Sequence, residues 1–268
     1  MAQSHKLPPA RQIAYGDHPD QVGNLHLLAE GDGPWPAVVL VHGGFWKWGW
    51  DRTLMTPLAR DLAARGFAAW NVEYRRVGQE GGGWPGTLAD AAAAVDALAD
   101  IDEVDASRVV TVGHSAGGHL ALWLAGRHRL PPGAPGAGPR VRPLGAVSQA
   151  GVADLMRGAE GRLGEGACQA LLGGEPADEP ERYAATSPAG LLPLGVPQLL
   201  VHGLLDDIVP PSQSHDYALA ARAAGDEVEL VELADADHFD VIETADPAWG
   251  AVIAWLERFR ARAPSAGK

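Results

Sequence analysis

The most constraining feature of the sequence is the run VVTVGHSAGG over residues 109–118. Four β-favouring residues lead into Gly-x-Ser-x-Gly, and helix-forming residues follow at 121–124. A strand, a sharp turn and a helix in this order hold a serine hydroxyl clear of the strand end. Gly113 and Gly117 flank Ser115 at positions where a Cβ would collide with the neighbouring chain. The run therefore predicts a strand–turn–helix unit with Ser115 as a candidate nucleophile.

A loop with two adjacent glycines follows an earlier buried strand. The continuous apolar run at 37–41 predicts a strand covered on both faces, and HGGFW at 42–46 comes directly after it. Because glycine lets the backbone approach a reacting carbon closely, N–H groups of such a loop can stabilise negative charge on an oxygen. The loop is therefore a candidate oxyanion-binding element.

Two later strand ends carry an acid and a histidine. The apolar run at 198–201 is followed by Asp206 and Asp207, and the alternating run at 227–233 is followed by His238. A serine nucleophile needs a histidine as base and an acid that orients the histidine. The separation between Asp206 and His238 leaves room for one helix and one strand, which would bring both residues to the same edge of a parallel sheet.

These motifs together resemble the α/β-hydrolase superfamily, and the HGGFW loop is similar to that of carboxylesterases and serine-type arylformamidases. The resemblance implies an α/β-hydrolase fold, with a mostly parallel central sheet flanked by helices. We expect a single domain over residues 1–268, with a small cap-like insertion around 151–197, where the periodic pattern loosens. The resemblance also implies acyl transfer to water through an acyl-enzyme, for which no cofactor is expected.

The resemblance assigns roles to individual residues. It implies that Ser115 is the nucleophile and His238 the general base. In the family, the oxyanion hole is formed by backbone N–H groups after the first glycine of the loop and after the nucleophile. Carried over, these N–H groups belong to Gly44, Phe45 and Ala116.

The acid must be chosen from two neighbouring aspartates. The family segment reads Gly, two variable residues, Asp, then three residues and Pro. Aligning it on Gly203 and Pro210 selects Asp206 over Asp207. Asp207 is then interpreted as an exposed residue at the start of the following helix.

Several aromatic side chains lie near the glycine loop in the sequence. Five tryptophans occupy these segments: Trp35, Trp46, Trp48, Trp50 and Trp84. An aromatic-lined pocket follows if they face inward, with Trp46, Trp48 and Trp84 as candidate substrate contacts. The alternative is that several pack on the scaffold. A small carboxylic ester with an aromatic or short acyl group is the favoured substrate. The alternatives are an aryl formamide such as N-formylkynurenine, or a non-catalytic small-ligand binding protein of the same fold.

A competing interpretation concerns the acidic loop around His238. The aspartates beside this histidine could suit a hard cation: Asp235, Asp237 and Asp240. The loop has neither the spacing of a calcium loop nor that of a zinc hydrolase. We therefore expect no metal there.

Other candidate residues have structural interpretations. His119 lies four residues after Ser115 on the following helix, so we interpret it as a structural residue. Cys168 lies in a short apolar run without a nucleophile context and is expected to pack in the core. Two helix starts are also predicted, with Thr56 as an N-cap and Thr87-x-x-Asp90 as a capping box.

Charge and composition exclude several classes of partner. The formal net charge is −13, whereas nucleic acids and anionic membranes bind basic surfaces. One cysteine allows no intramolecular disulfide, which fits a reducing compartment. Residues 1–11 lack the apolar core of a signal peptide, and no stretch has the length of an apolar membrane span. We expect a cytoplasmic protein that binds a small-molecule ester or amide and neither nucleic acid nor membrane.

Overall fold

The computed structural model describes residues 7–28, 31 and 33–260. Eight strands form one sheet in the order β1-β2-β4-β3-β5-β6-β7-β8. The strands are β1 (Arg11–Ala14), β2 (Val22–His26), β3 (Trp35–Val41), β4 (Ala68–Val72), β5 (Val104–His114), β6 (Gly145–Gln149), β7 (Gln198–Gly203) and β8 (Val228–Leu233). The strands from β3 to β8 run parallel, while β2 pairs antiparallel with both β1 and β4. The expected mostly parallel sheet is confirmed.

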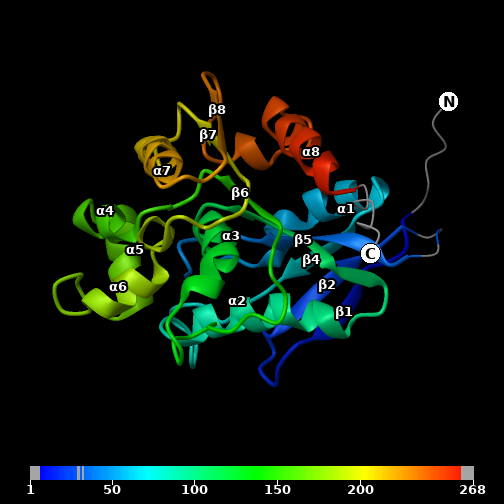
Figure 1. The fold of residues 1–268 in the computed structure, drawn as a ribbon, viewed down its shortest axis with the longest axis horizontal. Helices are drawn as coiled ribbons and strands as arrows, with labels where there is room; N and C mark the ends of the chain where they lie inside the picture. Colours follow the sequence, from blue (N-terminus) through cyan, green and yellow to red (C-terminus); the bar gives the residue numbers. More distant parts are fainter. Residues whose placement is uncertain (1–6, 29–30, 32, 261–268) are drawn as a thin grey trace.

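Helices cover both faces of this sheet. The α-helices are α1 (Thr56–Ala64), α2 (Gly86–Asp96), α3 (Ala116–Gly126), α4 (Leu155–Glu160), α5 (Leu163–Leu172), α6 (Pro180–Thr186), α7 (Ser212–Ala223) and α8 (Pro247–Arg260). The short 3-10 helices are η1 (Arg52–Met55), η2 (Ala97–Asp100), η3 (Arg127–Arg129), η4 (Pro188–Leu191) and η5 (Asp240–Ile242). Figure 1 shows α1 and α8 together on one face, with α2 and α3 on the other. Among the described residues, no helix is both long and apolar enough to cross a membrane.

The alternation of side chains along β3 explains the two layers of core. Val39 and Val41 belong to the apolar cluster that includes α2, α3 and α7. Val38 and Leu40 belong to the cluster formed with α1 and α8. All four side chains are fully buried, because successive residues of a strand point to opposite faces and both faces are covered. The uninterrupted apolar run is therefore a consequence of the central position of β3.

The segment between β6 and β7 contains three short α-helices, α4 to α6, followed by η4. Figure 1 shows α4, α5 and α6 gathered at one end of the molecule, beyond α3. This segment corresponds to the insertion expected around residues 151–197. It contacts the core through fully buried residues such as Leu171, Leu172 and Tyr183.

Both expected helix starts are wrong in detail. The residue before α1 is Met55, because η1 leads directly into the helix and places Thr56 inside it. The capping box fails because α2 begins at Gly86, so Thr87 is already helical. The Thr87 hydroxyl donates to the carbonyl of Arg75, and Asp90 accepts two hydrogen bonds from the Arg75 guanidinium. The Asp90 carboxylate, which the local spacing predicts to cap the helix, is thus paired with Arg75 instead.

Two predictions from the sequence extend beyond the described residues. The residues at 24–29 predict a strand, which is observed as β2, Val22–His26, and residue 29 lies outside the described part. The sequence also predicts fraying at 264–268, and these residues lie entirely outside the described part. The apolar spacing at 247–260 predicts a closing amphipathic helix, which α8 confirms.

Candidate active site

Ser115 lies at the sharp turn between β5 and α3. Its backbone has φ 56° and ψ −120°, a region that non-glycine residues rarely adopt. The Ser115 N–H donates to the carbonyl of Gln149 on β6 at 2.8 Å, which fixes the turn to the neighbouring strand. Backbone strain of this kind persists only where the surroundings over-determine it, and it is common at functional sites.

The glycines around Ser115 are required by close approach of the backbone. A Cβ on Gly113 would lie 2.0 Å from the carbonyl oxygen of Gly117. A Cβ on Gly117 would lie 2.0 Å from the carbonyl oxygen of Val41, at the end of β3. Both obstacles are backbone atoms that cannot rotate away. The sharp turn at Ser115 therefore brings α3 closer to β3 and β5 than a side chain at either glycine would allow.

We expect Gly117→Ala to lower the free energy of unfolding by about 3 kcal/mol or more, since the added methyl group forces the backbone apart. The measurement is the urea midpoint. Gly250→Ala is the matched control, because Gly250 lies on α8 with no atom within 4 Å of an added Cβ. That control should be neutral or stabilising by up to about 1 kcal/mol. Equal midpoints for the two variants would contradict the close-approach argument.

Asp206 and His238 follow the ends of β7 and β8 and meet directly. The Nδ1 of His238 donates to Oδ2 of Asp206 at 2.7 Å, and both side chains are buried. The other carboxylate oxygen of Asp206 accepts the backbone N–H groups of Ile208 and Val209. Asp207 is exposed. The structure thus brings Asp206 to the histidine and leaves its neighbour at the surface.

A second histidine binds the same carboxylate. His202, near the end of β7, donates from Nε2 to Oδ2 of Asp206 at 3.1 Å, and its Nδ1 accepts from the Ser214 hydroxyl at 2.7 Å. Burial alone would raise the pKa of Asp206, but hydrogen bonds from His202, His238 and the Val209 N–H outweigh it and hold the pKa well below its usual range. Sequence analysis missed His202, although its place just before Gly203 at a strand end was a visible signal.

His114 links the sharp turn at Ser115 (the serine turn) to the loop that carries His238 (the histidine loop). Its Nε2 donates to the backbone carbonyl of His238 at 2.8 Å, and the two imidazole centroids are 4.6 Å apart. Burial and the nearby His238 lower the pKa of His114 to about 3. His114 is therefore neutral at physiological pH and acts as a fixed hydrogen-bond donor.

A small cavity of about 80 Å³ brings several expected site residues together. Its wall is formed by Gly44, Phe45, Trp50, Leu54, His114, Ser115, Ile208, His238 and Phe239. The candidate nucleophile, the candidate base and two of the candidate oxyanion donors therefore face one space. Ala116, the third candidate donor, is the first residue of α3 and is fully buried.

The glycine loop after β3 is held in a strained turn. Gly44, Phe45 and Trp46 all have positive φ, at 109°, 52° and 56°. The Lys47 N–H closes the turn by donating to the carbonyl of Gly44 at 2.9 Å. A Cβ on Gly44 would lie 2.5 Å from Trp50, so glycine is required there.

A buried polar cluster anchors the first residue of the loop. The Nε2 of His42 donates to the Glu73 carboxylate at 2.9 Å, and the Tyr74 hydroxyl donates to the His42 carbonyl at 2.9 Å. The rings of His42 and Tyr74 stack with centroids 4.5 Å apart. Burial would raise the pKa of Glu73, but hydrogen bonds from His42 and the Arg52 N–H lower it below its usual value. A charged Glu73 thus fixes the backbone ahead of the candidate oxyanion donors.

The structure places the tryptophans expected to contact substrate outside the wall of the cavity beside Ser115. Trp46 is fully buried, and its Nε1 donates to the Ala116 carbonyl at 3.2 Å. Trp48 is 69% exposed, and the backbone N–H of Trp84 donates to the carbonyl of Leu171 in the insertion. As the described residues form it, the cavity wall contains none of these three and includes Trp50 instead. For Trp46, the positive φ values at 44–46 turn the side chain in a direction that sequence spacing does not reveal.

The remaining candidates have structural roles in this structure. His119 is fully buried, contacts Trp46 and donates from Nε2 to the Thr186 carbonyl at 3.0 Å; burial lowers its pKa to about 4. Cys168 is buried in the insertion, which raises the pKa of its thiol to about 12. Neither side chain lies in the wall of the cavity beside Ser115.

Two of the aspartates around His238, Asp237 and Asp240, accept hydrogen bonds from backbone N–H groups. One carboxylate oxygen of Asp237 accepts the N–H groups of Phe239 and Asp240, and Asp240 accepts the N–H of Asp237. Within the described residues, no group of three or more His, Cys, Asp or Glu side chains has an arrangement that could hold a metal ion.

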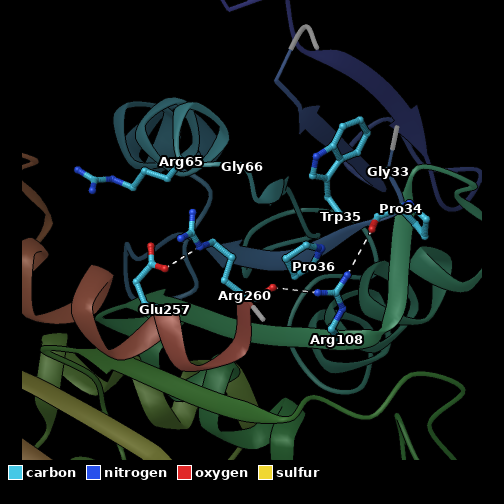
Figure 2. Close-up of a pocket in the computed structure, with 9 residues that line it drawn as sticks. All are labelled: Gly33, Pro34, Trp35, Pro36, Arg65, Gly66, Arg108, Glu257 and Arg260. Carbon is cyan, nitrogen blue, oxygen red and sulfur yellow. Dashed lines mark hydrogen bonds and ion pairs between the residues drawn. The ribbon is translucent and has the colours of Figure 1, made fainter. Parts of the chain in front are cut away.

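A larger, open cavity of about 560 Å³ lies at the start of β3, away from Ser115 (Figure 2). Three arginines line it, but their charged groups have partners. Arg108 donates to the carbonyls of Pro34 and Arg260, and the Arg260 guanidinium pairs with Glu257. The cavity beside Ser115 is therefore the stronger candidate for chemistry.

The protein has the α/β-hydrolase fold. This class is defined here by the order of the strands, by the sharp turn at Ser115 and by the loop that carries His238. It belongs to the BD-FAE family, whose model matches residues 24–220. Among solved structures, it is similar to a truncated carbohydrate esterase from gut microbiota, with a TM-score of 0.84 and 17% identity over 97% of this chain and 99% of that one. It is also similar to a propionate-bound thermophilic esterase from the Planctomycetes species Thermogutta terrifontis, with a TM-score of 0.75 and 24% identity over 96% and 97%.

Two curated relatives extend the comparison. The esterase LipC of Mycobacterium tuberculosis is 27% identical over 252 residues, which cover 88% of this chain and 61% of LipC. The isoprenylcysteine alpha-carbonyl methylesterase ICME of Arabidopsis thaliana is 33% identical over 120 residues, which cover 41% of this chain and 26% of ICME. The chain thus spans less than two thirds of the length of either relative.

Proposed function

We propose that the protein is a serine hydrolase that cleaves small carboxylic esters through an acyl-enzyme. The observation that carries this proposal is the cavity shared by Ser115 and His238, with Asp206 hydrogen-bonded to His238 at 2.7 Å. Nucleophile, base and orienting acid are the three parts that this chemistry requires. The esterase names of LipC and ICME support the same reaction class.

The proposed steps follow from the positions of these groups. The Ser115 hydroxyl attacks the ester carbonyl while Nε2 of His238 takes its proton. Asp206 holds the His238 tautomer through Nδ1 and stabilises the imidazolium. The backbone N–H groups of Gly44, Phe45 and Ala116 bind the oxyanion. His238 then gives the proton to the leaving alcohol, and water hydrolyses the acyl-enzyme by the same steps.

The cavity favours a short acyl group. Its volume of about 80 Å³ is well below the few hundred Å³, roughly 300–1,000, of pockets for drug-sized ligands. Trp50 and Phe239 stack at 5.9 Å between ring centroids and remain partly exposed. We assign the acyl group to the part of the cavity beside Ser115, and the alcohol part of the ester to its exposed edge, where this aromatic pair lines the same cavity. The Thermogutta terrifontis esterase has propionate bound, and propionate is a short carboxylate, which supports this choice.

An acyl-chain series tests this assignment. Wild type and Ser115→Ala should be assayed with p-nitrophenyl acetate, butyrate and octanoate, and with N-formylkynurenine. We expect kcat/KM to be highest for acetate or butyrate and at least about 10-fold lower for octanoate, since each methylene that does not fit costs about 1 kcal/mol or more. A wide preference for N-formylkynurenine would replace the proposal with arylformamide hydrolysis. Equal kcat/KM values for p-nitrophenyl octanoate and p-nitrophenyl acetate would contradict the short-acyl assignment.

Two further parts of the proposal concern the chain as a whole. We assign residues 151–197 to a small cap on a single domain, because α4 to α6 gather at one end of the molecule. A cytoplasmic location stays a prediction from the single cysteine.

A further inference from the structure

The insertion contains a left-handed turn at residues 162–166. Gly164, Glu165 and Gly166 have φ/ψ values of 57°/38°, 60°/36° and 89°/31°, and Arg162 has 49°/39°. Left-handed backbone costs roughly 1–2 kcal/mol for each non-glycine residue, so consecutive left-handed residues need a structural reason. The reason lies in what this turn touches.

The turn packs directly on the strained glycine loop. A Cβ on Gly164 would lie 2.7 Å from Cδ1 and Cε1 of the Phe45 ring. The ammonium group of Lys47 donates to the carbonyl of the same glycine at 3.0 Å. Gly164 is therefore held between two side chains of the loop, and only a residue without a side chain fits there.

Trp46, between these two residues, is bound to the scaffold. Its carbonyl accepts the Val77 N–H at 2.7 Å, and its indole donates to Ala116 at the start of α3. Phe45 and Lys47 instead contact Gly164 in the insertion. The loop is thus held from two sides, and its strained φ at Phe45 depends on both.

We propose that the turn at 162–166 is a positioning element for the oxyanion hole. Gly164 sets where the Phe45 ring lies, and the ring fixes both the direction of the Phe45 N–H and one wall of the acyl cavity. The inference rests on the proposed esterase function. It makes Gly164 and Lys47 positioning residues that act through Phe45.

The first test is Gly164→Ala. The new methyl group displaces the Phe45 ring, so kcat for p-nitrophenyl acetate should fall about 10- to 100-fold, as expected for a misplaced oxyanion donor. KM should change by less than about threefold, because the lost interaction is made mainly in the transition state. Gly138→Ala is the matched control, since Gly138 has φ 69° with no atom within 4 Å of an added Cβ. It carries the same backbone strain and should keep wild-type kcat.

Two measurements separate positioning from a general loss of structure. The inhibition constant of a trifluoromethyl ketone, which presents an oxyanion to the hole, should rise in Gly164→Ala in parallel with the loss of kcat/KM. In a double-mutant cycle, Phe45→Leu should reduce the effect of Gly164→Ala, because leucine keeps the backbone N–H and removes the ring that the new methyl group would contact.

If Gly164→Ala does not fold, Lys47→Met supplies the test. In this variant kcat should fall several-fold and the inhibition constant should rise. Lys47→Arg is its control, because arginine keeps a charged donor at this position.

The outcomes distinguish this inference from the function on which it rests. An inactive wild type would overturn the proposed function. An active wild type in which Gly164→Ala matches Gly138→Ala in kcat and in the inhibition constant would overturn the positioning role alone. The positioning role would also be overturned if the effects of Gly164→Ala and Phe45→Leu were additive, because the effect of Gly164→Ala would then not pass through the Phe45 ring.

Discussion

Ser115→Ala should reduce kcat for p-nitrophenyl acetate by about 10⁴- to 10⁶-fold, because alanine removes the oxygen that forms the acyl-enzyme. The rest of the site remains in this variant, so a small residual rate from the oxyanion hole is expected. The change removes one oxygen from a side chain that is 2% exposed, and circular dichroism should report an unchanged fold.

A fluorophosphonate probe gives an independent readout of the same residue. It should label wild type at Ser115 and leave Ser115→Ala unlabelled. Ser107→Ala is the control, because Ser107 is exposed on β5 and its hydroxyl binds only Asp105 among the described residues. Wild-type turnover in Ser115→Ala would show that the reaction does not pass through this serine. A wild type that neither labels nor turns over would indicate a ligand-binding protein of the same fold.

Asp206→Asn should lower kcat by about 10⁴-fold, whereas Asp207→Asn should stay within about twofold of wild type. An amide in place of the carboxylate cannot both accept from Nδ1 of His238 and stabilise the imidazolium. Asp207 is exposed, so its charge is screened by water and contributes little. The two variants make the same chemical change at neighbouring positions and therefore control for each other.

The stability of Asp206→Asn must be followed alongside its rate. Asp206 accepts from His202, His238 and two backbone N–H groups, and an amide cannot satisfy all of these donors. Each measured rate should therefore be divided by the fraction of folded protein, which is obtained from urea denaturation. A large loss of kcat in Asp207→Asn, with Asp206→Asn close to wild type, would reverse the choice between the two aspartates.

The strand-end positions of Ser115, Asp206 and His238 could be predicted because each follows a local pattern. An apolar run identifies a buried strand, and in a parallel sheet the carboxyl ends of strands share one edge. The structure brings these three residues together as that rule requires. Their catalytic roles stay predictions until the variants are measured.

The pocket wall could not be predicted because it depends on backbone angles. Trp46 and Trp50 are four residues apart, yet the positive φ values at Phe45 and Trp46 bury one indole and send the other to the cavity. Neither hydrophobic periodicity nor composition reports such angles. The same limit hid Gly164, whose contact with Phe45 joins segments far apart in the chain.

Long-range ion pairs account for another failure. Thr87 and Asp90 have the spacing of a helix cap, but Asp90 is buried beneath Arg75. A fully paired buried carboxylate outweighs a local cap that contributes about 1 kcal/mol. His202 was missed for a related reason, since its partners Asp206 and Ser214 lie beyond the end of its own strand.

The hydrogen bond from His114 to the carbonyl of His238 has a consequence for protein engineering. The motif Gly-x-Ser-x-Gly leaves its first variable position unspecified. Here the side chain at that position links two loops that lie 124 residues apart in the chain. We expect that substitutions at residue 114 that remove this donor would shift His238 relative to Ser115. Transplanting this turn into another scaffold would require moving the histidine loop with it.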